Sequence, residues 1–418
     1  MPTNMPNRPD PTRNAALTLL RAVLNQHRAL DSALDSLTAP ARDRAAAHRL
    51  AAGTLRRLGT LDAALEPYLR RAPPPDVRHI LRLGAAGLLF LQTPPHAAVG
   101  TAVGLAHANG LSPFAGLINA VLRKLAAAGP EALDALDSPR LDTPPWLWAA
   151  WGSHARAIAI AHQHEAPLDL TLRPGAEAPA GGTTLPTGTI RFPPGTAPTA
   201  LPGFADGAFW VQDAAAALPA RLLAAQPGEY VLDLCAAPGG KTAQLATTGA
   251  HVTALERDAP RLARLRHNLA RLALATETIE ADALLWQPPT RADAVLLDAP
   301  CSATGTIRRH PDVPHLKRAK DIAPLATTQD ALIARAHAML KPGGRLIYAV
   351  CSLQPEEGPA RIATALATGA WRVSPFTPQE FTNFPTLPTD AGYLSTNPAQ
   401  WAEFGGVDGF FAARLIAT

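Results

Sequence analysis

Hydrophobic residues in the first third of the chain recur at helical spacing. Leu17, Leu20 and Leu24 would share one face of a helix, and runs of the same spacing follow, separated by short proline breaks. No strand-like alternation interrupts them. The pattern predicts an all-α bundle of about five to seven helices over residues 11–128.

The pattern changes after Tyr230, where apolar strand-like runs alternate with helical segments. Such alternation is typical of a parallel sheet with helices on both faces, whose ligands bind beyond the carboxyl ends of the strands. The expected strands are 230–235, 251–255, 276–280, 293–297 and 345–350, and the expected helices are 240–248, 258–273 and 324–340.

The chain is therefore expected to be multidomain, α followed by α/β. Residues 1–10 are polar and proline-rich and are expected to form a disordered tail. Residues 129–145 predict a linker, 146–222 a small α/β subdomain with long loops, and 223–418 the strand–helix domain.

The net charge of +4 is unevenly distributed. Residues 1–128 carry 15 Lys/Arg against 7 Asp/Glu, a balance of +8, whereas residues 129–418 carry 23 against 27, a balance of −4. A basic half is typical of a polyanion-binding module, although scattered solvated arginines would explain the charge equally well. The candidate phosphate-binding residues are Arg42, Arg44, Arg56, Arg57, Arg123 and Lys124.

No apolar stretch approaches the roughly 18 residues of a membrane span, and the first residues have no apolar signal core. A soluble, cytoplasmic protein is expected. The three cysteines cannot build a disulfide framework, and their spacing offers no metal site.

The first expected strand runs into a loop of small residues, Asp-Leu-Cys-Ala-Ala-Pro-Gly-Gly-Lys-Thr at 233–242. Its glycines and the helix N-terminus that follows would let a ligand approach the backbone closely. The dinucleotide pattern Gly-x-Gly-x-x-Gly is absent. A phosphate-binding NTPase loop would need glycine at position 235, where Cys235 stands, so an NTPase is the weaker alternative.

S-adenosylmethionine fits the same loop better, because it carries no phosphate. By analogy with dinucleotide folds, it needs an acid about 20 residues further on for its ribose hydroxyls. Glu256 ends the second expected strand, and Asp282, beyond the third, could meet the adenine. Taken alone, Glu256 would be read as an ordinary helix-cap acid.

All three cysteines follow expected strands. A lone buried cysteine is usually inert, and we assign that role to Cys235. Cys301 and Cys351 together favour cytosine chemistry, because a thiolate that adds to C6 activates C5 toward a methyl donor. Asp298 is placed to act as the acid at N3, and the target base must be unstacked to reach these groups. The spacing does not decide which thiol attacks.

These motifs resemble the Sun/Fmu (RsmB-type) family of bacterial small-subunit (16S) rRNA cytosine-C5 methyltransferases over about residues 12–415. Besides 233–242, the likeness rests on Leu-Leu-Asp-Ala-Pro-Cys-Ser-Ala-Thr-Gly at 296–305, Ile-Arg-Arg-His-Pro-Asp at 307–312, Tyr-Ala-Val-Cys-Ser at 348–352 and Asp-Gly-Phe-Phe at 408–411. In the helical half, Leu-Arg-Leu-Gly-Ala at 81–85, Pro-His-Ala-Ala-Val at 95–99 and Ile-Asn-Ala-Val-Leu-Arg at 118–123 resemble that family's NusB-like RNA-binding domain.

The resemblance implies a Rossmann-like class I methyltransferase domain and a monomer acting on 16S rRNA, with Cys351 as the nucleophile and Cys301 releasing the product. It also implies a set of residues that bind S-adenosylmethionine: Cys235, Ala236, Ala237, Pro238, Gly239, Gly240, Lys241, Glu256, Asp282 and Asp298.

The chain departs from the family pattern at two points. Glu256 stands where the family mostly has Asp, and Pro174-Gly175 follows Arg173 where Asn is expected at the second position. Three alternatives remain: the same chemistry on tRNA or 23S rRNA, a non-catalytic NusB-like assembly factor, and a DNA methyltransferase. In the last of these the cysteine after proline, here Cys301, would attack.

Overall fold

The computed structural model describes residues 10–381 and 388–418. It consists of two compact units, Met1–Glu165 with Ile307–Arg318, and Ala166–Thr306 with Ala319–Thr418. This division is coarser than the five segments expected from the sequence, whose finer bounds remain a prediction. The expected disordered tail lies outside the described residues except for Asp10, whose side chain caps the first helix.

The first unit is helical, which confirms the all-α expectation. Over residues 11–128, all of them described, the α-helices are α1 (Pro11–Leu24), α2 (Leu30–Asp35), α3 (Ala41–Arg56), α4 (Leu58–Leu65), α5 (Pro75–Leu89), α6 (Pro95–Ala108) and α7 (Ala115–Ala128). Helices α5 and α6 each begin with proline, which suits the first helical position because that residue needs no hydrogen-bonded N–H there. The apolar faces meet in one core that includes Leu17, Leu55 and Leu81.

The same unit continues beyond residue 128. The expected linker contains the short helices η3 (Gly129–Leu133) and α8 (Ser138–Leu141). After it come α9 (Pro145–Trp151), η4 (Gly152–His154) and α10 (Ala155–His162). Two short 3-10 helices lie earlier in the unit, η1 (Glu66–Tyr68) and η2 (Ser112–Phe114). The distant segment Ile307–Arg318, with α14 (Val313–Leu316), also belongs to it. There Asp312 Oδ2 accepts a hydrogen bond of 2.9 Å from the Leu30 amide at the start of α2.

The second unit contains two sheets. The smaller sheet has the order β2-β3-β1-β4, antiparallel throughout, with β1 (Leu168–Leu172), β2 (Thr183–Thr184), β3 (Ile190–Phe192) and β4 (Phe209–Val211). The buried pair Arg191–Asp169 holds it together through two hydrogen bonds, of 2.7 and 2.6 Å.

The larger sheet has the order β10-β12-β9-β8-β5-β6-β7, with β11 paired to β12. Its strands are β5 (Tyr230–Leu234), β6 (His251–Glu256), β7 (Glu277–Glu280), β8 (Ala292–Asp298), β9 (Leu340–Val350), β10 (Trp371–Val373), β11 (Leu394–Thr396) and β12 (Phe410–Ala417). The five expected strands pair in parallel as predicted. The expectation of a purely parallel sheet was wrong at one edge, where β12 runs antiparallel to β9 and also pairs with β10 and β11.

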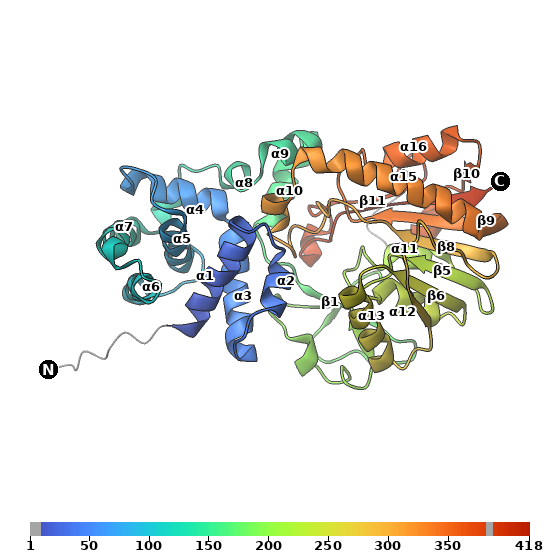
Figure 1. The fold of residues 1–418 in the computed structure, drawn as a ribbon, viewed down its shortest axis with the longest axis horizontal. Coiled ribbons are helices and arrows are strands. Elements are labelled where there is room, and N and C mark those ends of the chain that lie inside the picture. Colours follow the sequence, from blue (N-terminus) through green and yellow to red (C-terminus); the bar gives the residue numbers. More distant parts are fainter. Residues whose placement is uncertain (1–9, 382–387) are drawn as a thin grey trace. The chain divides into compact units, whose positions relative to one another are not determined.

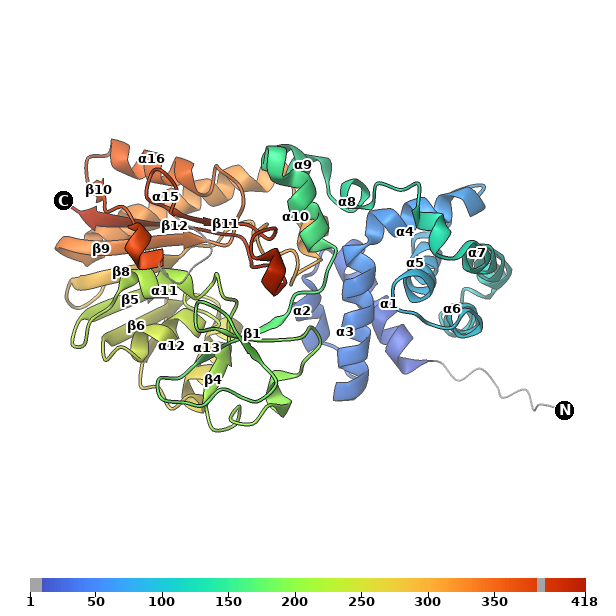
Figure 2. The ribbon, with the colours of Figure 1, turned by 180° about the vertical axis from the view of Figure 1, so that it is seen from behind.

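Helices cover both faces of this sheet (Figures 1 and 2). On one face Val231 and Leu296 pack in a core with α11 (Leu218–Leu223) and α12 (Gly240–Ala246), and α13 (Ala259–Arg271) covers β6. On the other face Leu232 and Leu297 pack in a core with α15 (Ile322–Met339) and α16 (Pro359–Ala367). Because both faces are buried, these strands read as continuous apolar runs. The short 3-10 helices are η5 (Pro198–Ala200), η6 (Ala319–Asp321), η7 (Pro378–Phe381) and η8 (Ala402–Phe404).

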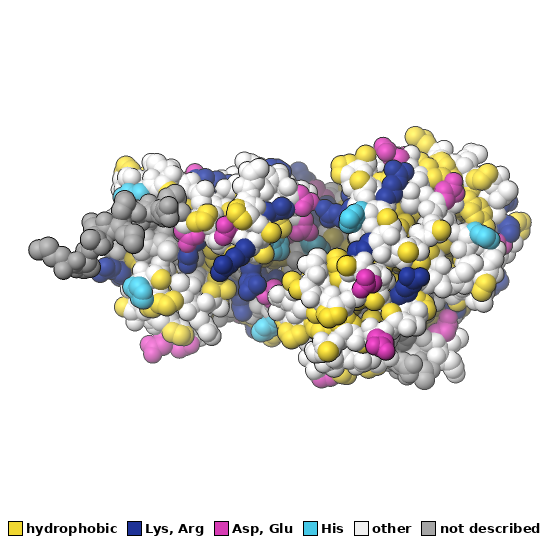
Figure 3. Space-filling model, turned by 90° about the horizontal axis from the view of Figure 1, so that it is seen from below, with side chains coloured by type: hydrophobic (Ala, Val, Ile, Leu, Met, Phe, Trp, Pro, Cys, Tyr) yellow, Lys and Arg dark blue, Asp and Glu magenta, His cyan; other side chains and the backbone are white. Residues whose placement is uncertain are grey.

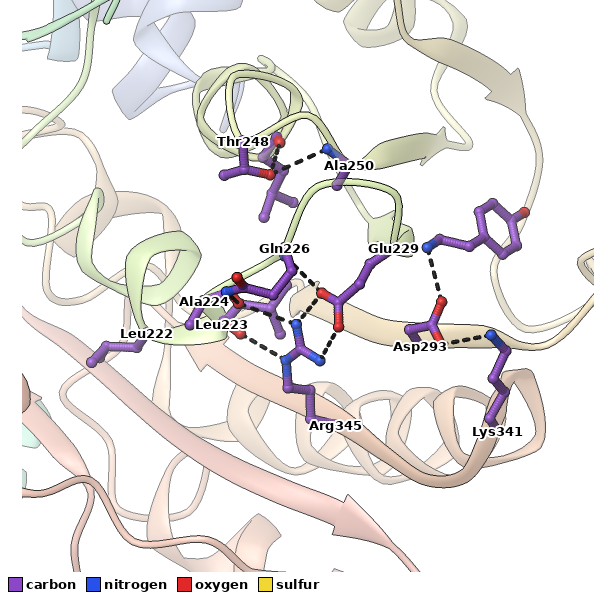
Figure 4. A network of polar contacts seen from close by, with 12 residues as sticks. Leu222, Leu223, Ala224, Gln226, Glu229, Thr248, Ala250, Asp293, Lys341 and Arg345 are labelled. Atoms are coloured by element: carbon purple, nitrogen blue, oxygen red, sulfur yellow. Dashed lines mark hydrogen bonds and ion pairs between the residues drawn. The ribbon is translucent and has the colours of Figure 1, made fainter.

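At the amino edge of the parallel strands, charged side chains are paired with one another (Figure 4). Arg345 donates to Glu229, and Lys341 donates to Asp293, which also accepts from the Tyr230 amide. The acidic and basic side chains at this edge therefore neutralise one another. Among the described residues, none of the helices is long and apolar enough to cross a membrane.

Candidate active site

The carboxyl ends of β5, β6, β8 and β9 lie side by side at one edge of the sheet. Leu234 pairs with both Leu255 and Leu297, and Asp298 lies opposite Ala349. The loops that follow these strands enclose a cavity of about 310 Å³. Seven of the predicted site residues line it: Cys235, Ala237, Glu256, Asp282, Asp298, Cys301 and Cys351. The other predicted residues do not line it: Ala236, Pro238 and Gly239 belong to the loop after β5, and Gly240 and Lys241 begin α12.

The loop after β5 is built by left-handed backbone at two positions. Gly239 has φ of 102° and forms the N-cap of α12, and a Cβ there would lie 3.3 Å from the Leu265 side chain. Cys235 has φ of 62°, an uncommon conformation for a residue with a side chain. Burial, reinforced by the charges of Glu256 and Asp298, raises the pKa of the Cys235 thiol to about 12. A thiol held protonated in this way is a poor nucleophile, consistent with the inert role predicted for it.

The side chain of Asp233 joins β5 to the start of α12. It is fully buried, and its Oδ2 accepts a hydrogen bond of 2.6 Å from the Thr242 hydroxyl. Burial raises the pKa of this carboxyl to about 7; the bond from Thr242 lowers it, and the charges of Asp298 and Glu256 add to the increase.

Glu256 provides an acceptor suited to the hydroxyls of a nucleoside. Its side chain is 2% exposed at the end of β6, and Oε1 accepts from the Asp258 amide at 3.1 Å. Its Oε2 lies 3.3 Å from Arg261 Nη1 but accepts no hydrogen bond from the described residues. A buried carboxylate oxygen with acceptor capacity left over fits a ribose hydroxyl.

Asp298 forms an ion pair with Lys241, for which the sequence analysis predicted only a role in cofactor binding. Lys241 Nζ donates to Asp298 Oδ2 at 2.8 Å and lies 5.1 Å from the centre of the Phe410 ring. Burial would lower the pKa of Lys241, but the charge of Asp298 and the hydrogen bond to it raise the pKa above its usual value, with Cys351 and Asp233 adding to the effect. The pair therefore presents a carboxylate and an ammonium together.

The two candidate thiols are in contact. The sulfur atoms of Cys301 and Cys351 lie 3.4 Å apart, although 50 residues separate them in the chain. The hydrogen bond with Cys351 raises the pKa of Cys301 well above its usual value, and burial and the charges of Cys351 and Glu357 act in the same direction. Cys301 is thus a thiol that its surroundings keep protonated.

Sequence reasoning missed a buried polar network beneath these thiols. Glu357 is fully buried, and its carboxylate accepts hydrogen bonds from Ser302 and Ser352, the residues that follow the two cysteines, and from Gln329. Glu356 and Glu357 are adjacent acidic residues in a loop after a strand, and such a pair in a sequence suggests solvent-exposed charges. Only the structure shows that Glu357 is buried whereas Glu356 is exposed.

The helical unit contains a second hollow. A groove of about 560 Å³ has an apolar floor that includes Ile80 and Leu105, and three arginines line it, Arg13, Arg42 and Arg49. Arg13 is paired with Asp10. Among the described residues, nothing forms a hydrogen bond or ion pair with the guanidinium groups of Arg42 and Arg49, and both residues are exposed. Figure 3 shows Lys and Arg side chains interspersed with apolar ones on the surface of this unit.

Two of the arginines expected to bind phosphates have structural contacts instead. Arg56 donates to the Arg308 carbonyl at 2.8 Å, and burial lowers its pKa to about 10. Arg57 lies 3.8 Å from Asp142 and 4.9 Å from the centre of the Phe90 ring. Arg44 lies 3.9 Å from Asp35, whereas Arg42, Arg123 and Lys124 are exposed.

Family models match both parts of the chain. Residues 220–416 match the model described as 16S rRNA methyltransferase RsmB/F, and residues 10–127 match the NusB family. The chain is 37% identical to the ribosomal RNA small subunit methyltransferase B of Pseudomonas putida, covering 97% of this chain and 98% of the relative. It is also 37% identical to the protein of that name from Xanthomonas campestris, covering 97% of both chains.

Solved structures share the fold. The crystal structure of PH0851 aligns with a TM-score of 0.73 at 21% identity, over 96% of this chain and 98% of that one. A methyltransferase homologue from Pyrococcus horikoshii aligns with a TM-score of 0.53 at 25% identity, over 68% of this chain and 96% of that one.

The raised pKa of Asp233 predicts a pH-dependent stability. Its pKa is 3.8 when unfolded and about 7 when folded, so the native state binds the additional proton between these values. The contribution to the free energy of unfolding should therefore fall as pH rises from about 4 to 7, by at most about 4 kcal/mol. Asp233→Asn, which keeps an acceptor for Thr242, should remove this fall in urea unfolding measured from pH 4 to pH 8. Asp206→Asn changes an exposed carboxyl and should leave the slope unchanged; equal slopes in the two variants would contradict the prediction.

Proposed function

Because this chain belongs to the RsmB/F family of S-adenosylmethionine-dependent rRNA methyltransferases, we propose that it methylates carbon 5 of a cytosine in small-subunit (16S) rRNA. The observation that carries the proposal is the contact of two thiols, 3.4 Å apart, in a cavity that Asp298 and Glu256 also line. A methyltransferase that acts on a nitrogen or a hydroxyl needs no such pair, because those atoms are nucleophilic already. Carbon 5 of cytosine is not, and needs covalent activation.

In the proposed reaction, ionised Cys351 adds to C6 of a cytosine that has left its stack. The electron pair of the C5–C6 double bond moves into the ring, and a proton held by the Lys241–Asp298 pair neutralises N3. Residues 235–241, Glu256 and Asp282 would hold S-adenosylmethionine, which would supply the methyl group to C5 and leave as S-adenosylhomocysteine.

Release of the product falls to Cys301. The pKa of Cys301 is raised mainly through its contact with Cys351. Once Cys351 is bonded to C6, its sulfur carries no charge and no longer raises the pKa of Cys301, and Cys301 gives its proton to water. The Cys301 thiolate then removes the C5 proton, the C–H electron pair re-forms the C5–C6 double bond, Cys351 leaves as a thiolate, and the N3 proton returns to the Lys241–Asp298 pair.

We further propose that the helical unit holds the RNA through the groove that Arg42 and Arg49 line. Unpaired guanidinium groups beside an apolar floor suit a single-stranded nucleic acid, whose phosphates carry charge and whose bases present flat apolar faces. The exposed Arg123 and Lys124 would add to this attraction.

Glu256→Ala should weaken the binding of S-adenosylhomocysteine. Loss of hydrogen bonds to a charged acceptor costs about 1.5–3 kcal/mol, which corresponds to roughly 10- to 150-fold in the dissociation constant. Isothermal titration calorimetry measures this directly. Glu256→Asp keeps the carboxylate and should lose less. Unchanged binding in Glu256→Ala, or tight magnesium-dependent binding of ATP to the wild type, would contradict the cofactor assignment.

The two cysteine variants should fail in different ways. Cys301→Ala retains the nucleophile but lacks the base, so the protein should accumulate joined to 16S rRNA, as a slow band on a denaturing gel that nuclease collapses. Cys351→Ala should give neither methylated product nor this band. The double variant should also lack the band, which would show that the adduct forms through Cys351. An adduct in Cys351→Ala instead would show that the two roles are reversed.

Binding of unmodified 16S rRNA to the full-length protein should weaken as salt rises. Arg42→Ala/Arg49→Ala should lower the magnitude of the log–log salt slope by about 1.4–1.8 if each arginine neutralises one phosphate. Arg291→Ala/Arg372→Ala removes the same charge from exposed positions of the other unit and serves as the matched control. Filter binding between 50 and 300 mM salt measures both slopes, and equal slopes in the two double variants would refute the groove as the binding site.

A further inference from the structure

Glu357 is a buried carboxylate to which the reaction proposed above gives no part. It is 0% exposed and lies in the loop between β9 and α16, two residues before that helix begins. Among the described residues, no cation forms an ion pair with its carboxylate, and four polar donors bond to it instead. Burying a charged carboxylate costs free energy unless hydrogen bonds replace its contacts with water. The four hydrogen bonds offset this cost, so the position of Glu357 depends on the groups that donate them.

The four donors come from the two loops that carry the thiols and from one helix. Oε1 accepts from the Ser302 amide at 2.9 Å and from Gln329 Nε2 at 3.0 Å. Oε2 accepts from the Ser302 hydroxyl at 2.5 Å and from the Ser352 hydroxyl at 2.6 Å. Ser302 follows Cys301 and Ser352 follows Cys351, so one carboxylate bonds to the residue adjacent to each sulfur.

Further bonds hold the residues around this carboxylate. Gln329 Nε2 also donates to the Pro300 carbonyl at 2.9 Å, on the other side of Cys301. The fully buried Tyr348 donates its hydroxyl hydrogen to the Glu357 carbonyl at 2.6 Å. Cys301 is therefore bracketed by Pro300 and Ser302, both of which are connected to Glu357.

We propose that Glu357 is the positioning residue that holds Cys301 and Cys351 at contact distance, by bonding to the loops of both. It touches neither the substrate nor the cofactor cavity, so it acts through the two serines. The importance of this spacing rests on the proposed two-thiol reaction, but the spacing itself can be measured without that reaction. The negative charge of Glu357 also contributes to keeping Cys301 protonated in the free protein.

A trivalent arsenical measures the spacing directly. Phenylarsine oxide condenses with two neighbouring thiols, forming two As–S bonds and releasing one water, with no oxidation or reduction. Wild type should bind one equivalent tightly. Cys301→Ala, which retains Cys235 and Cys351, sets the background for a protein without the Cys301–Cys351 pair.

Glu357→Ala should weaken arsenical binding at least about tenfold and slow methylation on the order of 10²-fold, because displacement of a reacting group by about 1 Å has such effects. Glu357→Gln keeps the shape but turns one acceptor oxygen into a donor, so an intermediate loss is expected. Glu356→Gln makes the same charge change on the adjacent exposed residue and should match wild type. Calorimetry with S-adenosylhomocysteine verifies that each variant is folded.

If Glu357→Ala does not fold, Ser302→Ala/Ser352→Ala removes two of the four donors while leaving the carboxylate, and should show the same loss of arsenical binding. Arsenical binding at the wild-type level in a folded Glu357→Ala or in the double serine variant would overturn the inference. If binding depends on Glu357 but Cys301→Ala forms no adduct with RNA, the positioning role stands and the proposed two-thiol reaction fails.

Discussion

The pairing of β8 with β9 determines where the two reactive sulfurs lie. The strands are adjacent and parallel, with Asp298 opposite Ala349, so the loops that carry Cys301 and Cys351 leave the sheet at neighbouring points. A slip of one residue would turn every side chain of a strand to the opposite face. The register therefore brings together residues that are 50 positions apart in the chain.

The loop that carries Cys301 also approaches the residues just before β12 more closely than a side chain would allow. A Cβ on Gly305 would lie 2.0 Å from the Gly409 carbonyl oxygen, and Gly305 donates to the Cys351 carbonyl at 3.0 Å. Glycine is required at this crossing because two backbones occupy the space of a side chain. The crossing accounts for the Asp-Gly-Phe-Phe motif near the end of the chain, which places its glycine against the cysteine loop and Phe410 beside Lys241.

The two edges of the parallel strands differ in how charge is balanced. At the amino edge the acids are paired with arginine and lysine, whereas at the carboxyl edge Asp233, Glu256 and Asp298 lie near one another with Lys241 as the one buried cation that the described contacts show. Burial raises the pKa of Asp233 and of Cys235, and the charges of Asp298 and Glu256 add to the increase. S-adenosylmethionine carries a sulfonium and an ammonium, so its positive charge would offset the repulsion among these carboxylates.

The sequence predicted what depends on local pattern and on motif, namely the helical bundle, the five parallel strands and the cofactor. It could not predict β12, because a fully buried strand and a buried helical segment have similar composition. Nor could it predict the pairing of Lys241 with Asp298 or the burial of Glu357, because polar residues in loops do not reveal their distant partners. Arg56 and Arg57 were misread for the same reason: a basic residue on a helix gives no sign in the sequence that its partners are a carbonyl at 308 and a carboxylate at 142.

The segment Ile307–Arg318 belongs to the helical unit, although in the sequence it lies between two parts of the other unit. It begins six residues after Cys301, yet its contacts are those of the helical unit: Asp312 caps the start of α2, and His315 bonds to the Leu55 carbonyl at 3.0 Å. A fragment ending at residue 128 or 165 would leave the Leu30 amide without its acceptor and would remove the Arg308 carbonyl from Arg56; the shorter fragment would also remove the His162 carbonyl that Arg56 bonds to. Unsatisfied buried donors cost about 1–3 kcal/mol each, so such a fragment would not reproduce the surface of the intact unit. RNA binding by the helical unit is therefore a property to be measured on the full chain, where residues 307–318 complete that unit.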